Sequence, residues 1–146
     1  MTRITKSAAI LFVDISKSSR IYEILEDRKE QENIGNTLSC LSATALEYSG
    51  QVIKTVGDSV ICTFDTSHRA VLAAKSMQQA VSACEPKADA AMPPIHVHIG
   101  IHQGPVVVDN GDIFGDAVNV TARVVDYANP RQIVATRAVI NSLPPG

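Results

Sequence analysis

The chain of 146 residues has no tryptophan, only 4% aromatic residues, and no excess of basic residues, because 13 Lys and Arg face 15 Asp and Glu. A nucleic-acid-binding domain usually carries a basic surface, and single-stranded ligands also need aromatic side chains for stacking. The three tyrosines are scattered along the chain and form no such cluster. The composition therefore disfavours a DNA- or RNA-binding function, and any polyanionic ligand must be met by local cations or by metal ions.

Disulfides and long apolar segments are also lacking. Cys40, Cys62 and Cys84 are odd in number, lie far apart and form no C-x-x-C pair, which favours buried, reduced thiols. The N-terminal apolar run stops at Asp14, too early for a signal peptide, and no segment approaches transmembrane length. We expect a cytoplasmic protein of one domain, since this length supports one hydrophobic core.

The periodicity of apolar residues predicts alternating strands and helices. Turn residues predict a hairpin closed at Gly57-Asp58 and a turn at Gln103-Gly104. A helix should end at Ser49-Gly50, where Gly50 can take a positive φ. The predicted strands are 8–15, 51–56, 59–64, 95–102, 105–114 and 131–136, and the predicted helices are 18–48, 67–84, 115–128 and 137–143. The order β-α-β-β-α-β with additions predicts an α+β, ferredoxin-like sandwich. Helices would cover one face of a mostly antiparallel sheet, leaving the other face for a ligand or partner chain.

Two acids stand at the ends of predicted strands. Asp14 closes an otherwise apolar strand, and Asp58 lies in the hairpin turn. If these strands are neighbours, both carboxylates emerge at one end of the sheet and form a hard-oxygen site suited to Mg²⁺ or Mn²⁺. Such pairs serve phosphoryl and nucleotidyl transfer. The alternative interpretation is local structure, because aspartate is common in turns and at helix caps.

A second polar cluster lies in the segment GDIFGDAVNVTARV. Asp112 precedes a predicted helix on which Asn119 and Arg123, four residues apart, share one face. An amide and a guanidinium placed there can hold a ribose and a phosphate oxygen. Alternatively, Arg123 is a solvated helix charge that pairs with Asp126.

Three histidines recur at even spacing in the segment IHVHIGIH. His96, His98 and His102 would share one face of a strand, which raises the alternative of a transition-metal site. No cysteine or carboxylate joins them at ligand spacing, so a structural role is favoured.

Three sequence blocks together resemble the catalytic domain of class III adenylate/guanylate cyclases. They are LFVDIS, VIKTVGDSVICTF and IGIHQGPVVV followed by GDIFGDAVNVTAR, and they occur in the family's order over roughly residues 8 to 136. The resemblance implies a class III nucleotidyl cyclase-like fold. It also implies two Mg²⁺ or Mn²⁺ ions per site, held by Asp14, Asp58 and the carbonyl of Ile15.

The resemblance further assigns the substrate contacts. The metal ions would grip the triphosphate and lower the pKa of the ribose 3′-hydroxyl, which attacks the α-phosphorus and releases pyrophosphate. Asn119 would orient the ribose and Arg123 would neutralise charge on the α-phosphate, while Lys17, Ser18 and Ser19 would form the turn at the phosphates. Family members are head-to-tail dimers, so a homodimer would place Asp14 and Asp58 opposite Lys54, Asp112, Asn119 and Arg123 of the other protomer.

Lys54 and Asp112 match the family's base-selecting pair. A lysine donor and a carboxylate acceptor complement the N1 acceptor and 6-amino donor of adenine, whereas guanine presents the reverse pattern. The expected function is therefore an adenylate cyclase, a lyase that makes cyclic AMP from ATP for intracellular signalling.

Besides a short link, Asp109-Asn110, between GPVVV and GDIF, the chain departs from the family in two respects. Lys17 stands where many relatives have glycine, and the sequence stops at Gly146, where relatives continue into another hairpin with a phosphate-contacting lysine. We therefore expect residues 1–146 to form one cyclase domain without that hairpin. The alternatives are a non-catalytic dimerisation or nucleotide-sensing module, or a cyclase of GTP. A diguanylate cyclase is disfavoured because the G-G-[DE]-E-F signature is missing.

Overall fold

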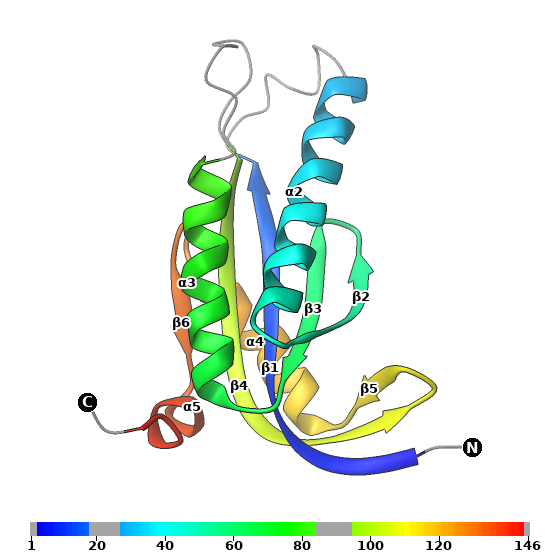
Figure 1. The fold of residues 1–146 in the computed structure, drawn as a ribbon, viewed down its shortest axis with the longest axis vertical. Helices are drawn as coiled ribbons and strands as arrows, with labels where there is room; N and C mark the ends of the chain where they lie inside the picture. The colour runs from blue at the N-terminus through cyan, green and yellow to red at the C-terminus, as the bar shows by residue number, and fades with distance from the viewer. Residues whose placement is uncertain (1–2, 18–26, 84–94, 145–146) are drawn as a thin grey trace.

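The structure is a computed structural model that describes residues 3–17, 27–83 and 95–144 (Figure 1). The predicted phosphate-turn residues Ser18 and Ser19 and the predicted loop 85–94 lie outside these ranges. The strands are β1 (Arg3–Lys17), β2 (Gln51–Val56), β3 (Ser59–Phe64), β4 (Ile95–Asp109), β5 (Asp112–Phe114) and β6 (Ile133–Ala135). The helices are α2 (Asp27–Glu47), α3 (Ser67–Ala83), α4 (Asp116–Asp126) and α5 (Arg137–Asn141).

The strands form one sheet in the order β2-β3-β1-β4-β5, and all four of these pairings are antiparallel. β6 pairs parallel with β4. The first four strands in this order are those of the β-α-β-β-α-β unit, so the predicted α+β, ferredoxin-like sandwich is confirmed. The hairpin 51–56 and 59–64 has the predicted bounds.

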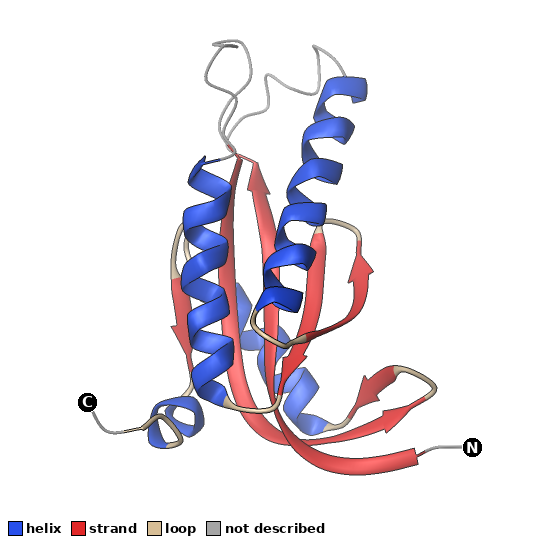
Figure 2. Ribbon diagram, viewed as in Figure 1, coloured by secondary structure: helices blue, strands red, loops and turns tan. Residues whose placement is uncertain are grey.

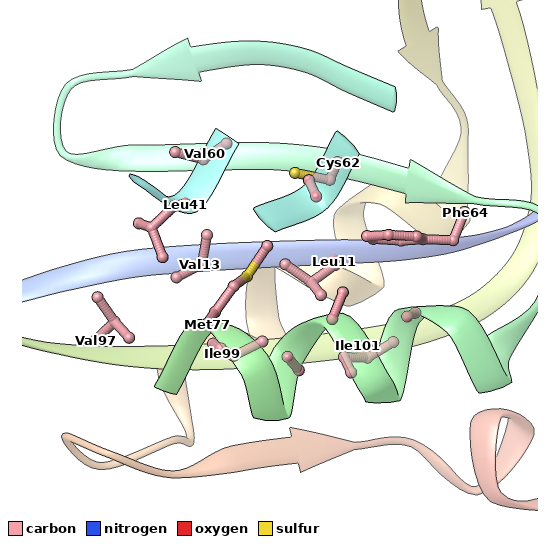
Figure 3. Close-up of a cluster of buried hydrophobic side chains, with 14 of the residues drawn as sticks. Leu11, Val13, Leu41, Val60, Cys62, Phe64, Met77, Val97, Ile99 and Ile101 are labelled. Atoms are coloured by element: carbon pink, nitrogen blue, oxygen red, sulfur yellow. The ribbon is translucent and has the colours of Figure 1, made fainter. Parts of the chain in front are cut away.

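Strand β1 is the centre of the molecule because both of its faces are buried. Leu11 and Val13 face α2 and α3, where they pack with Leu41, Met77 and other apolar side chains (Figure 3). The alternate residues Ala8, Ile10 and Phe12 face the other side of the sheet. A strand with two buried faces must be apolar throughout, which explains the uninterrupted run that ends at Asp14.

The two faces of the sheet carry different helices. Helices α2 and α3 lie side by side on one face, as predicted (Figure 2). On the opposite face, Ala117 and Val125 of α4 pack against β1 and β4, so this face is partly covered as well. Gly100 of β4 allows the close approach, because a Cβ there would lie 2.6 Å from the backbone nitrogen of Val125.

The turn predicted at Gln103-Gly104 is wrong, since β4 continues through these residues to Asp109. β1 begins at Arg3 and supplies hydrogen-bonding partners along all of β4, with Ala8 opposite Gly104. Gly104 serves packing instead, because a Cβ at this position would lie 3.0 Å from the Cβ of Ala117 in α4. The chain turns at Asn110 and Gly111, whose φ values are 52° and 78°.

Strand β2 contains a β-bulge that the alternating sequence did not predict. Val52 lies opposite Cys62 and Lys54 lies opposite Ile61, so Ile53 is an extra residue. Without it, Lys54 would lie opposite Val60 and face α2 and α3. The bulge turns Lys54 to the side of the sheet that carries α4.

Two further predicted boundaries shift. Helix α2 ends as predicted before Gly50, but the positive φ of 64° belongs to Ser49, and the Gly50 N–H donates to the carbonyl of Ala45. The described part of the predicted helix 18–48 begins at Asp27. None of the helices in the described ranges is long and apolar enough to cross a membrane.

Candidate active site

The two predicted metal acids lie together at one end of the sheet. Asp14 is near the end of β1, and Asp58 is in the turn between β2 and β3, the strand paired with β1. The backbone N–H of Ile15 donates to the carbonyl of Asp58 at 3.0 Å, which joins the two segments directly. The structure therefore brings Asp58 to Asp14 and Ile15, although Asp58 follows Ile15 by 43 residues in the sequence.

The carboxylate of Asp14 is contacted by side chains from both neighbouring strands. Ser59 of β3 donates its hydroxyl hydrogen to Oδ1 at 2.5 Å, and Nε2 of His98 in β4 lies 3.4 Å from Oδ2. The other ring nitrogen of His98, Nδ1, is 2.7 Å from Oγ of Ser16. Sequence patterns alone did not indicate Ser59 or Ser16, and the signal that would find them is the antiparallel register.

The donor set fits a hard divalent cation. Asp14 and Asp58 offer carboxylate oxygens beside the backbone of Ile15, and Mg²⁺ commonly binds through one or two carboxylates while keeping several waters. No group of three or more His, Cys, Asp or Glu side chains suited to a metal occurs among residues 3–17, 27–83 and 95–144. An ion bound here would therefore complete its coordination with water or substrate oxygens.

Lys54 and Asp112 meet directly, although β2 and β5 are at opposite ends of the strand order. Nζ of Lys54 donates to Oδ2 of Asp112 at 3.1 Å, and Oδ1 of Asp112 accepts from the N–H of Ile113 at 2.8 Å. The Ile113 hydrogen bond, followed by that of Lys54, holds the pKa of Asp112 below its usual value. Asp112 is therefore an ionised acceptor at neutral pH.

Helix α4 presents Asn119 and Arg123 on its exposed side. Ala117, Thr121 and Val125 are the buried residues of this helix, whereas Asn119 and Arg123 are both exposed. The two side chains share one helix face, as their spacing predicted. Within the described ranges neither is joined to Asp14 by a hydrogen bond or ion pair. The hydrogen-bond and ion-pair partners of Asp14 in these ranges are Ser59 and His98 instead.

The three histidines of β4 have separate partners. His98 contacts Asp14 and Ser16, His102 Nδ1 is 2.8 Å from Oγ1 of Thr136, and Nδ1 of His96 accepts from Nε of Arg131 at 3.1 Å. These contacts favour the structural interpretation over a transition-metal site. Lys17, the remaining predicted phosphate residue, is the last residue of β1.

Comparisons with known proteins agree on one family. The sequence profile of the adenylate and guanylate cyclase catalytic domain matches residues 2–145. The chain is 29% identical to an adenylate cyclase of Anabaena cylindrica, in a match that covers 95% of this chain. It is 26% identical to an adenylate cyclase of Streptomyces coelicolor, in a match that covers 96% of this chain. It spans 31% and 35% of these two curated relatives, and so less than half of either.

Solved structures share the fold. An adenylate/guanylate cyclase/hydrolase from Silicibacter pomeroyi is 31% identical with a TM-score of 0.82, and the match covers 96% of this chain and 81% of that one. The adenylyl cyclase CyaB from P. aeruginosa, 22% identical, has a TM-score of 0.85 with coverages of 97% and 82%. The guanylate cyclase domain of RhGC from Catenaria anguillulae, in complex with GTP, is 19% identical with a TM-score of 0.82 and coverages of 97% and 84%. The chain belongs to the adenylate and guanylate cyclase catalytic domain family, the class III nucleotidyl cyclases.

Proposed function

We propose that this chain is an adenylate cyclase domain that converts ATP to 3′,5′-cyclic AMP and pyrophosphate. The observation that carries this choice of substrate is the contact between Lys54 and Asp112, 3.1 Å apart on the strands β2 and β5. In this proposal residues 1–146 form one catalytic domain, and the pair reads the base.

The chemistry of the pair favours adenine. Lysine can only donate hydrogen bonds, and the low pKa of Asp112 keeps its carboxylate an acceptor at neutral pH. Adenine offers an acceptor at N1 and a donor at its 6-amino group, so both side chains find a partner. Guanine offers a donor at N1 and an acceptor at O6, which reverses the pattern. A site that leaves polar groups unpaired discriminates against the mismatched ligand.

The phosphates would bind at the end of the sheet that carries Asp14 and Asp58. Asp14, Asp58 and the carbonyl of Ile15 would hold two Mg²⁺ or Mn²⁺ ions, and Lys17, Ser18 and Ser19 would lie beside the triphosphate. When bound, such ions stabilise the negative charge of the attacking and leaving oxygens. The acids hold their place through the Ile15–Asp58 backbone hydrogen bond, which fixes the turn against β1.

Asn119 and Arg123 would act on the reacting atoms. Asn119 would orient the ribose so that its 3′-oxygen can attack the α-phosphorus as the hydroxyl proton passes to solvent water. The bond between the α-phosphorus and the bridging oxygen then breaks, and pyrophosphate departs with that oxygen. Arg123 would stabilise the charge that develops on the α-phosphate, which is the general role of a guanidinium in phosphoryl transfer.

We propose a homodimer in which each site combines the acids of one protomer with α4 and the base-reading pair of its partner. The outward orientation of Asn119 and Arg123 supports this arrangement, because both can meet a second chain. Val56 and Phe114 support it as well. They are 55% and 50% exposed, and each lies two residues from a member of the Lys54–Asp112 pair. Exposed apolar side chains beside a functional pair suit a protein interface.

Product analysis tests the proposal. The chain is incubated separately with ATP, GTP, CTP and UTP in the presence of Mn²⁺, and products are identified by mass spectrometry. Cyclic AMP from ATP alone is the expected result, and Lys54→Gln should lower the preference for ATP over GTP by about 10-fold or more. Cyclic GMP as the main product, formed from GTP, would favour a guanylate cyclase, the activity named for several solved structures with this fold. No cyclic product from any nucleotide would favour a non-catalytic module.

A further inference from the structure

The carboxylate of Asp14 has a protein partner for each of its two oxygens. Ser59 donates to Oδ1 at 2.5 Å, and His98 lies with Nε2 at 3.4 Å from Oδ2. Ser16 contacts the far side of the same imidazole, 2.7 Å from Nδ1. We call Ser16, Ser59 and His98 the Asp14 network.

With an ionised Asp14 and a neutral His98, one assignment of hydrogens makes the contacts of this network complementary. An ionised carboxylate only accepts, so the Ser59 hydroxyl must donate to it. A neutral imidazole carries one N–H, and the tautomer with hydrogen on Nε2 lets His98 face Asp14 with a donor. Nδ1 is then an acceptor, and Ser16 donates its hydroxyl hydrogen to it. This arrangement gives every polar atom of the network a complementary partner.

The network joins the three central strands of the sheet, β3, β1 and β4, near their ends. Ser59 and His98 are the residues directly opposite Asp14 on the two strands that flank β1. Residues opposite one another in antiparallel strands project from the same face with their Cβ atoms close together. Three neighbouring strands therefore fix the orientation of one carboxylate, and none of the three partners lies on a loop.

We propose that Ser59 and His98 are positioning residues that hold Asp14 in the orientation that binds the metal ion. Each carboxylate oxygen has two lone pairs, so one contact per oxygen leaves a lone pair on each for a cation. Ser59 makes the closer contact and should contribute more than His98. The inference rests on the proposed function, because it assumes that Asp14 is a metal ligand.

Removal of a positioning residue should measurably weaken the affinity for the metal ion. Loss of a residue that orients a metal ligand typically weakens metal affinity by about 10- to 100-fold. Ser59→Ala removes the hydroxyl, whereas Ser59→Thr keeps a hydroxyl on the same strand position. The comparison therefore separates loss of the hydrogen bond from disturbance of the strand. Ser67→Ala is a further control, because it removes a buried hydroxyl that donates to Gln103 at 2.7 Å, away from Asp14.

The experiment is a titration of the chain with Mg²⁺ alone, followed by the amide NMR signals of Asp14, Ile15 and Asp58. We expect the dissociation constant to rise about 10-fold in Ser59→Ala. It should stay within twofold of the unaltered chain in Ser59→Thr and Ser67→Ala. His98→Leu should also weaken binding, and His98→Gln, which keeps an N–H donor, should restore part of it.

Two results would overturn the inference. One is an affinity of Ser59→Ala for Mg²⁺ within twofold of that of the unaltered chain. The other is the absence of any Mg²⁺-dependent shift at Asp14 in the unaltered chain. Thermal unfolding of each variant shows whether it is folded. If Ser59→Ala is not, Ser59→Val replaces it, because valine lacks the hydroxyl of threonine, has nearly its shape and favours a strand. Cyclic AMP formation by the unaltered chain tests the proposed function separately, so either idea can fail without the other.

Discussion

Gly100→Ala is the substitution whose effect the structure predicts in most detail. A Cβ at Gly100 would lie 2.6 Å from the backbone nitrogen of Val125, 2.7 Å from its Cα and 3.0 Å from its Cβ. Two of these atoms belong to the backbone of α4, so no side-chain rotation can relieve the contact. The helix itself must move away from β4.

The expected cost is large for the addition of one methyl group. Overpacking a close-packed core destabilises by about 1 to 3 kcal/mol, and a clash with backbone belongs at the upper end, about 2 to 3 kcal/mol. For a domain of this size that corresponds to a fall in melting temperature of about 4 to 12 °C. Cyclase activity should fall even at temperatures where the variant is fully folded, because the displaced helix α4 carries Asn119 and Arg123.

Urea denaturation followed by circular dichroism measures the free energy of unfolding. The matched control is Gly35→Ala in the middle of α2, where a Cβ would have no atom within 4 Å. The control should be more stable by about 0.5 to 1 kcal/mol, because alanine restricts the unfolded chain and favours a helix. A loss of less than about 0.5 kcal/mol in Gly100→Ala would refute the close packing of α4 on β4.

Three other predictions concern the site and the core. Asp58→Ala should abolish turnover without unfolding the chain. Mixing it with inactive Arg123→Ala chains should restore part of the activity, because one site of the heterodimer is then intact. A mixture that stays inactive despite subunit exchange contradicts the shared site. Burial raises the pKa of the Cys62 thiol to about 12, so iodoacetamide at pH 8 should label it only after unfolding, as mass spectrometry of the peptide can show. Burial lowers the pKa of His102 despite the nearby Asp116, so the unfolded chain binds that proton more tightly, and the free energy of unfolding should fall as the pH drops below about 6.5. His102→Gln should flatten this dependence in urea titrations at pH 5 to 7, and an unchanged slope would contradict it.

Local patterns were sufficient to predict most of the fold. The alternation on either side of Gly57-Asp58 gave the correct bounds of β2 and β3, because a tight hairpin depends on residues close in sequence. The apolar run ending at Asp14 identified the central strand. Placing Asp14 and Asp58 at one end of the sheet then required only that the hairpin pair with that strand.

The remaining features depend on contacts between distant segments. Gly104 resembles a turn residue locally, yet β1 extends far enough to pair with β4 on both sides of it, and α4 needs the space above it. Ser59 and His98 become neighbours of Asp14 only once three strands are in register. No single segment of the sequence contains that register.

The bulge at Ile53 also affects whether the edge strand β2 can pair with a strand of another molecule. β2 ends the strand order, and an edge strand with regular unpaired backbone groups can add a strand from another molecule and start aggregation. An extra residue disturbs that regular spacing, and a lysine beside it makes the edge charged. The residue that turns Lys54 toward Asp112 thus also makes the edge of the sheet less regular, which disfavours the addition of a strand. Solubility and the proposed recognition of the base would therefore both depend on the bulge at Ile53.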